Sequence, residues 1–420
     1  YLDENRQVTI DQSISSIQDF PFILYAEPEY IKKLYYTPND KFYSSQCSPE
    51  AVKADLAWDY WDIPDEIGDE NILLASVDTG VDYTHPDLIA NIWVNQGEIP
   101  EWIFEIKDID LNGDGLLSAG EISDFMLTQS DLNGDGYNNI RDALVAGSPF
   151  VDNIDNDGNE YVDDLIGWDA SGISGTADND PFPKEGSGVP NDGDWAHGTH
   201  VAGILAATTN NGIGMASSIF NGKILSVKCS RDGSDEDEPP INDGYDGITY
   251  AAKAGHFAGA RTIINCSWGG GGNNTFEQAV INIADSIYGA IVVAAAGNGD
   301  EDTHQEEYAA HYPASNENIV SVCAMSCNGN WGNWATYHPT VDLAAPGDNI
   351  YSTIIGDGYQ TWDGSSMASP NAASVMGLVW SYHPSWTNED VIEQVKLAAD
   401  SSIYDINPDY IDCNGNEGSY

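Results

Sequence analysis

Basic residues are scarce in this sequence. It has 14 Lys and Arg against 68 Asp and Glu, which gives a formal net charge of -54 over 420 residues. Nucleic acid and anionic membrane surfaces are therefore not expected as partners, because phosphate-rich surfaces are bound by basic faces. So acidic a chain repels itself, and bound cations or high salt would offset that repulsion. An acidic secreted protein and a salt-adapted protein both fit this composition.

Long apolar runs and paired cysteine motifs are also absent. No stretch of about 18 apolar residues occurs, so no membrane span is expected. The polar start, YLDENRQVTI, is unlike a signal peptide. The six cysteines include no CxxC pair, which argues against a zinc site. One or two disulfides fit an oxidising compartment. We expect Cys323 to pair with Cys327, whereas Cys229 and Cys266 lie in apolar stretches typical of buried thiols.

Short apolar segments alternate with helical patterns along most of the chain. Segments rich in Val and Ile, bounded by glycine or polar residues, are typical of strands buried on both faces, and they occur at 71–80, 222–230, 260–270, 288–298 and 318–325. Helices are expected at 197–209, 246–260, 275–289, 366–384 and 387–402. This alternation predicts an α/β fold with a mainly parallel central sheet.

Residues 95–194 break that alternation. The segment is rich in Asp, Asn and Gly, and about twenty acidic residues stand there against three basic ones. We predict that it is an insertion between the first strand and a later helix, with little core of its own.

Four polar residues stand where strands are expected to end or helices to begin. Asp78 and Asn298 end strands, and His197 and Ser366 open helices. Ligands bind near the carboxyl ends of parallel strands. A serine hydroxyl becomes a nucleophile when a histidine takes its proton and a carboxylate orients that histidine, while a carboxamide stabilises the oxyanion. These residue types predict acyl transfer. Pro370 is expected in the first turn of its helix, where proline is tolerated.

The motifs around these residues resemble a known family. VDTGVDYTHPDL, HGTHVAG and GSSMASP are similar to the active-site blocks of the subtilisin-like serine proteases, or subtilases, and AAAGN and NCSWGG to their oxyanion and substrate-binding segments. The resemblance covers residues 36–402 or so. It implies a three-layer α/β sandwich and a serine endopeptidase acting on polypeptides, with Asp78, His197 and Ser366 as the triad and Asn298 in the oxyanion hole. Ser365 departs from the family's usual threonine, and His200 is expected to be structural.

The resemblance also suggests where substrate would bind. The walls of the primary pocket are expected from the backbones of Ser267, Trp268, Gly269, Ala295, Ala296 and Gly297. Two acidic stretches, 235–238 and 300–302, follow strands near which the family lines its subsites. They either favour Lys and Arg in the substrate or are solvated loops.

The N-terminal region is similar to the thermitase-like branch of the family. YYTPNDKFYSSQ resembles the start of its catalytic domain, and FPFILYAEPEYI resembles the tail of its inhibitory propeptide. Residues 1–35 are therefore expected to be a propeptide tail or an N-terminal extension, and residues 36–420 the catalytic domain. The chain's own propeptide is the expected inhibitor, and a secreted monomer is the expected form.

Calcium (Ca2+) is the expected cofactor, at several sites. DIDLNGDGLLSAGE has the spacing of a calcium-binding loop, and two similar acidic loops follow it, although plain Asn-Gly turns look alike. The first two loops are expected to form a paired module. The expected ligands are Asp110, Asn112, Asp114, Leu116 and Glu121 in the first loop, Asp131, Asn133, Asp135, Tyr137 and Asp142 in the second, and Asp155, Asp157, Asn159, Tyr161 and Asp164 in the third. The subtilase resemblance implies a fourth site at Asp40, Asp87, Thr209, Asn211, Ile213 and Met215.

Three functions fit these features. The first is a secreted, calcium-stabilised serine endopeptidase that works through an acyl-enzyme. The second is a processing protease of narrow specificity, and the third is a calcium-dependent binding module on an inactive protease scaffold. The presence of all four catalytic residue types favours an enzyme.

Overall fold

The structure is a computed structural model that describes residues 14, 20, 22–26, 36–61, 67–184, 193–232, 239–299, 307–407, 410–411 and 417–418. The chain divides into two compact units, Tyr1–Tyr36 and Thr37–Tyr420. In the first unit, the Ile23 amide donates to the Phe20 carbonyl. The role of residues 1–35 stays a prediction, and the acidic stretches 235–238 and 300–302 lie outside the described residues.

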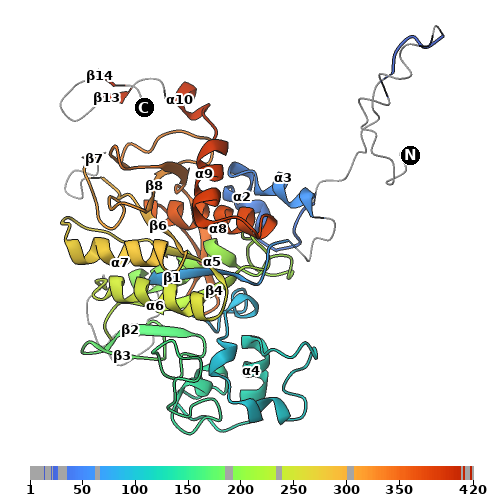
Figure 1. Cartoon of the computed structure of the whole chain (residues 1–420), viewed down its shortest axis with the longest axis vertical. Coiled ribbons are helices and arrows are strands. Elements are labelled where there is room, and N and C mark those ends of the chain that lie inside the picture. Colours follow the sequence, from blue (N-terminus) through green and yellow to red (C-terminus); the bar gives the residue numbers. More distant parts are fainter. Residues whose placement is uncertain are drawn as a thin grey trace. The chain divides into compact units, whose positions relative to one another are not determined.

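The second unit is built on an eight-stranded sheet in the order β10-β8-β6-β5-β1-β4-β2-β3 (Figure 1). Its paired strands are parallel except for β2 and β3, so the predicted mainly parallel sheet is confirmed. Every residue of β1 is buried, which explains its unbroken apolar sequence. The strands are β1 Ile72–Asp78, β2 Gly167–Ile173, β3 Thr176–Asp178, β4 Lys223–Lys228, β5 Arg261–Cys266, β6 Ile291–Ala295, β8 Val320–Met325 and β10 Leu343–Pro346.

Helices cover both faces of this sheet and complete the predicted three-layer α/β arrangement. Helices α6 and α7 pack together on one face, and α5 and α8 pack together on the other, with α9 beside α8 (Figure 1). All five were predicted, and their bounds are α5 His197–Ala206, α6 Gly244–Phe257, α7 Thr275–Ser286, α8 Ser365–Tyr382 and α9 Asn388–Ala398. Side chains set two of the starts: Asn274 accepts from two amides of α7, and Thr387 forms a capping box with Asp390 at α9.

Shorter elements connect these layers. The helices and turns are η1 Tyr43–Ser45, α2 Ser48–Ala51, α3 Ala54–Ala57, η2 Trp58–Tyr60, η4 Ile89–Asn91, η5 Gln96–Glu98, η6 Glu101–Glu105, α4 Ala119–Met126, η7 Ile140–Leu144, η8 Gly193–Ala196 and α10 Ile403–Ile406. The additional strand pairs are β7 Glu307–Tyr308 with β9 Thr336–Tyr337, β11 Ile350–Ile354 with β12 Gly358–Trp362, and β13 Tyr410–Ile411 with β14 Glu417–Gly418. The described helices include none with the length and hydrophobicity of a membrane span.

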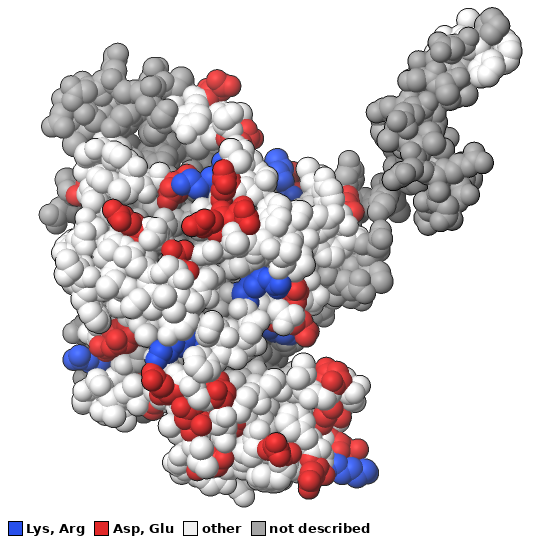
Figure 2. All heavy atoms as spheres, viewed as in Figure 1, with Lys and Arg blue, Asp and Glu red and all other residues white. Residues whose placement is uncertain are grey.

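The acidic segment 95–194 lies between β1 and α5, and Figure 1 shows its helix α4 beyond the β2–β3 edge of the sheet. Acidic side chains outnumber basic ones on the face of the molecule seen in Figure 2. The segment nevertheless buries more than its composition indicates: Ile103, Ile122, Met126 and Ile140 are fully buried, and η7 packs against α4. Its last part supplies β2 and β3 to the central sheet. The expectation of little core was therefore wrong.

The predicted disulfide was also wrong. Cys327 is bonded to Cys47, from which it is separated by 280 residues. Cys323 is a free buried thiol, because β8 carries its side chain into the core before the chain leaves the sheet and reaches Cys327. Cys229 and Cys266 are buried free thiols, as predicted.

Candidate active site

An ion pair joins the end of β1 to the start of α5. Asp78 Oδ1 lies 2.7 Å from His197 Nδ1, and it also accepts from the Thr79 amide at 2.7 Å. Gly198 lets the helix come this close, since a Cβ there would lie 2.3 Å from the carbonyl oxygen of Gly80. Burial alone would lower the pKa of His197, but the charge of Asp78, its hydrogen bond and the charge of Asp194 outweigh burial and raise it. Asp78 thus favours the imidazolium, the form in which a histidine has taken a proton.

Ser366 is held against the segment that follows β5. Its Oγ donates to the carbonyl of Ser267 at 3.0 Å, and its own carbonyl accepts from Ser267 Oγ at 2.7 Å. Pro370 explains the second bond. Contrary to prediction, Pro370 lies past the first turn of α8, inside the helix. A proline has no N–H to donate to the residue four positions earlier. The carbonyl of Ser366 is therefore left without that partner, and Ser267 supplies one.

Asn298 follows the end of β6 and turns its carboxamide toward α8. Its Oδ1 accepts from the amide of Ser365 at 2.8 Å and from Ser365 Oγ at 2.9 Å. A Cβ added to Gly364 would lie 3.5 Å from both Asn298 Nδ2 and the Ser366 amide nitrogen. These two donors therefore border the same point, as an oxyanion hole requires. The hydroxyl of Ser365 makes the bond to Asn298, and threonine, the usual residue here, carries the same hydroxyl.

One expected wall of the primary pocket contacts Ser366, and the other contacts the neighbouring Ser365. Ser267 bonds to Ser366, and the Gly297 amide donates to Ser365 Oγ at 3.1 Å. Trp268 is fixed by its indole N–H, which donates to the carbonyl of Val77 at 2.7 Å. A pocket of about 330 Å³ beside His197 has Asp78, Ser267 and Trp268 in its lining. The substrate-contacting roles of these residues, and of Gly269, Ala295 and Ala296, stay predictions.

His200 lies about one helical turn after His197, and both rings stack with Trp362. Its Nε2 donates to the carbonyl of Gln360 at 3.1 Å, and its ring stacks on Trp362 with centroids 4.4 Å apart. Burial lowers the pKa of His200 to about 3, so the ring is neutral at ordinary pH. These contacts agree with a structural part for His200.

Four of the residues expected at the fourth calcium site, Asp40, Asp87, Asn211 and Met215, are linked by hydrogen bonds. Asp40 Oδ2 accepts from the Asn210 amide at 2.8 Å, and Asp87 accepts from Asn211 Nδ2 at 2.7 Å and from the Met215 amide at 2.8 Å. Burial raises the pKa of Asp87 to about 6, and the charge of Asp40 adds to the effect. Asp40 and Asp87 are buried carboxylates that contact the same loop, and carboxylate oxygens are ligands that a hard cation prefers. The ligand roles of Asp40, Asp87, Thr209, Asn211, Ile213 and Met215 stay predictions.

The first two acidic loops fold alike. In each, the first aspartate accepts from two glycine amides: Asp110 from Gly113 and Gly115, and Asp131 from Gly134 and Gly136. In each, the last acid accepts from the second and third amides of the loop, Glu121 in one and Asp142 in the other. Helix α4 joins the loops and packs on η7, as a paired module would.

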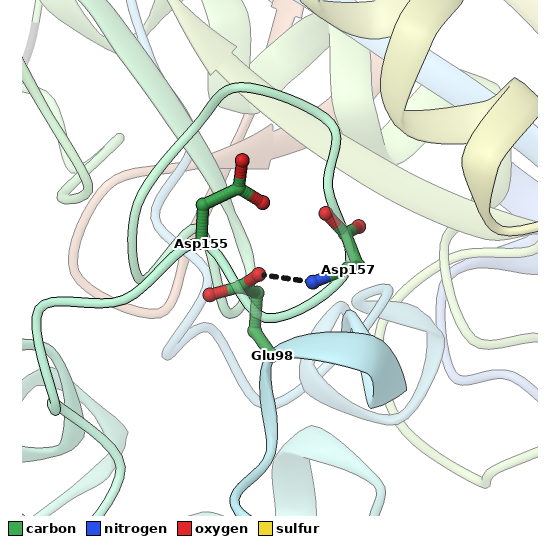
Figure 3. A group of neighbouring side chains, drawn as sticks. All are labelled: Glu98, Asp155 and Asp157. Atoms are coloured by element: carbon green, nitrogen blue, oxygen red, sulfur yellow. Dashed lines mark hydrogen bonds between the residues drawn. The ribbon is translucent and has the colours of Figure 1, made fainter.

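The third loop takes its last acid from a distant part of the chain. The amides of Asn156 and Asp157 are the second and third of this loop, and both donate to Glu98 Oε1, at 2.8 and 3.1 Å. Figure 3 shows the bond from Asp157. Oxygens of Glu98, Asp155 and Asp157 lie within 4.8 Å of one another, which fits a cation. Burial raises the pKa of Glu98 to about 7.

Glu98 was missed by sequence reasoning, which chose Asp164 as the last ligand. Asp164 lies outside this group of three and accepts from Tyr250 Oη at 2.8 Å and from Asn159 Nδ2 at 3.0 Å. One sequence feature could have indicated this: the apolar Ile166 occupies the loop position that Glu121 and Asp142 hold in the first two loops. That position cannot supply a ligand oxygen from its side chain, so the last ligand of a cation in this loop would have to come from elsewhere.

A second group of acidic residues is paired with a lysine of the chain itself. Asp169, Asp178 and Asp232 also have oxygens within 4.8 Å of one another. The ammonium of Lys228, fully buried, lies 2.8 Å from both Asp169 and Asp232. This group is therefore an internal ion-pair network. The first two loops do not meet the same distance criterion among the described acids.

Comparisons with known proteins agree with this geometry. Residues 69–411 match the Subtilase family. Thermophilic serine proteinase of Bacillus sp. (strain AK1) is 30% identical over 372 residues, which cover 88% of this chain and 66% of that protein. Thermitase of Thermoactinomyces vulgaris is 32% identical over 355 residues, 84% of this chain and 88% of that protein. Halolysin-like extracellular serine protease Nep of Natrialba magadii is 28% identical over 369 residues, 88% of this chain and 50% of that protein.

Solved structures share the fold. Sphericase aligns with a TM-score of 0.55 at 21% identity, covering 84% of this chain and 90% of that chain. The match to the family extends over most of the chain and includes every element that carries the candidate triad. The chain belongs to the subtilase family of subtilisin-like serine endopeptidases.

Proposed function

We propose that the chain is a secreted, calcium-stabilised endopeptidase in which Asp78, His197 and Ser366 form the catalytic triad. The observation that carries this proposal is the short contact between Asp78 and His197, at 2.7 Å, beside a serine fixed by Ser267. A calcium-dependent binding module on an inactive scaffold would not require this arrangement.

The geometry suggests a sequence of steps. The hydroxyl of Ser366 turns from the Ser267 carbonyl to His197 Nε2, gives up its proton and attacks the scissile carbonyl. Asn298 Nδ2 and the Ser366 amide donate to the resulting oxyanion. His197 then protonates the leaving amine. In the second half of the reaction His197 takes a proton from water, which attacks the acyl-enzyme, and then returns a proton to Ser366 as the acid product leaves. Asp78 holds the imidazole and stabilises its cation throughout.

Separate features support the proposed secretion and the proposed calcium binding. The Cys47–Cys327 disulfide is typical of an oxidising compartment, and a similar protease is named as extracellular. The desolvated carboxylates of Asp87 and Glu98 support calcium, which would neutralise them and so stabilise the folded chain. Polypeptides are the proposed substrates.

Fluorophosphonate labelling followed by peptide mapping tests the triad. We expect the probe on Ser366 in the wild type, no labelling of Ser366→Ala, and retained labelling of Ser365→Thr, which keeps the hydroxyl that bonds Asn298. An unlabelled wild type that still binds calcium would favour the binding module, and a label on Ser365 would contradict the assigned nucleophile.

A further inference from the structure

The pocket of about 330 Å³ beside His197 contains one carboxylate that the proposed mechanism leaves unused. Asp78 serves the triad, whereas Asp194 is exposed and lines the same pocket. Within the described parts of the chain, no basic side chain pairs with Asp194. Its charge helps to raise the pKa of His197, which places the carboxylate near the imidazole.

The backbone holds Asp194 in place. The next residue, Trp195, is 2% exposed and packs with Ile354 and Ile355. Its carbonyl accepts from Thr79 Oγ1 at 3.1 Å, and Thr79 adjoins the catalytic aspartate. The carboxylate of Asp194 therefore projects from an anchored turn at the edge of the cleft.

The rest of the pocket includes an apolar surface. Pro239, Ile241 and Trp268 line it, and all three are half-buried, so part of each remains open to a ligand. Trp268 is rigid because its indole bonds to Val77 and its ring meets Tyr245 edge-on at 5.7 Å. An apolar surface with one carboxylate fits a side chain that has an apolar stem and a cationic end.

We propose that this pocket selects a lysine or arginine two residues upstream of the cleaved bond, with Asp194 binding the cationic group. The pocket touches His197 and Ser267, beside the nucleophile, and it is separate from the 295–297 wall expected for the residue at the cleaved bond. The methylene stem lies along Ile241 and Trp268, and the charged head meets Asp194. This inference rests on the proposed protease function and names a substrate class for it.

The overall negative charge of the chain could also produce a preference for basic peptides. The net charge of -54 attracts any basic peptide, whatever the position of its charge. A positional preference that depends on one carboxylate is what distinguishes a pocket from that general field.

The test uses peptides that differ only in the residue two positions upstream of the cut, with lysine compared with its uncharged analogue norleucine. The measured quantity is the ratio of the two kcat/KM values. Any effect of Asp194 on His197 acts on both peptides and cancels in the ratio. For a partly exposed ion pair, worth up to about 1 kcal/mol, we expect the wild type to prefer lysine by up to about fivefold.

Three variants make the test specific. Asp194→Asn should bring the ratio close to one, and Asp194→Lys should reverse it. Asp124→Asn, the same substitution at an exposed position of α4, should keep the wild-type ratio. Melting curves establish that the variants are folded.

The outcomes distinguish a failure of the pocket proposal from a failure of the proposed protease function. A wild-type ratio near one, an Asp194→Asn ratio equal to the wild type, or an equal preference for lysine at every position would overturn the pocket while leaving the protease intact. Absence of hydrolysis of every peptide, and of fluorophosphonate labelling, would overturn the proposed function and the pocket with it.

Discussion

The catalytic cleft and the acidic loops achieve their geometry in different ways. In the cleft, groups from distant parts of the chain hold one another: Asp78 holds His197, and Ser267 holds Ser366. In the loops, carboxylates such as Asp110 and Asp155 accept mainly from backbone amides of their own loop, and Asp155 also faces the carboxylates of Glu98 and Asp157.

The two regions differ in whether a buried carboxylate has a counter-charge within the protein. The buried carboxylate of Asp78 contacts the imidazole of His197, which becomes cationic in the proposed mechanism, so the charge of Asp78 has a partner in the protein. Glu98 has amide donors, but burial and the nearby charge of Asp157 disfavour its ionised form. A buried carboxylate needs a counter-charge. We therefore expect the cleft to be complete as folded, and the loops to be complete only with a cation.

The largest expected effect is confined to the cleft. Ser366→Ala removes the proposed nucleophile, and we expect kcat for peptide hydrolysis to fall by about 10⁶-fold. Because Ser366 makes no charged contact, the melting temperature should stay near that of the wild type, in calcium and in chelator alike. Steady-state kinetics and melting curves on one preparation check both points, and substantial residual turnover would refute the assignment.

The next effect concerns the oxyanion donors. Asn298→Ala should lower kcat by about 10²- to 10³-fold, or roughly 2.7–4 kcal/mol, with little change in KM. Ser365→Ala should lower kcat less, because it only frees the carboxamide of Asn298 to rotate. Ser365→Thr is the matched control and should keep wild-type kcat. A change confined to KM in Asn298→Ala would count against a role in the transition state.

The loops should respond to metal where the cleft does not. Calcium at about 100 times its Kd adds roughly 2.7 kcal/mol of stability per site. If Glu98 is a ligand, Glu98→Gln should lower the melting temperature in calcium and raise it in chelator, because the variant removes an unpaired buried charge. Asp124→Asn should change neither. An equal loss in both conditions would mean that Glu98 serves only as a hydrogen-bond acceptor.

The smallest effect is a shift in pH dependence. The neutral imidazole of His197 is the proposed base, so kcat/KM should fall as the pH drops through its pKa. Asp194 helps to raise that pKa. Removing the charge in Asp194→Asn should therefore move the acid limb toward lower pH, so that the variant keeps its activity in more acidic buffer. An acid limb that stays in place or moves upward would contradict this electrostatic link.

The sequence predicted those parts of the structure that local patterns determine. Buried strands such as β1 are continuous apolar runs, and α9 carries its own cap, so both could be found without the fold. The proposed catalytic residues lie at strand ends and helix starts, and the carboxyl ends of parallel strands are where ligands bind.

Long-range contacts could not be predicted in this way. Cys47 and Glu98 meet partners 280 and 58 to 65 residues away, and only the fold brings them together. Strands β2 and β3 were missed because their sequence is rich in glycine and aspartate and lacks the apolar run of the central strands. The position of Pro370 inside α8 makes sense only once Ser267 is seen to bond the freed carbonyl.

Hydrogen exchange in calcium and in chelator tests the contrast between the two regions most directly. We predict that chelation speeds exchange at amides that donate to loop carboxylates, such as those of Gly113, Gly134 and Asn156, and leaves amides of β1 and β5 protected. Equal acceleration in the loops and in those strands, or no change in the loops, would contradict the view that the cleft is complete by itself and the loops are not.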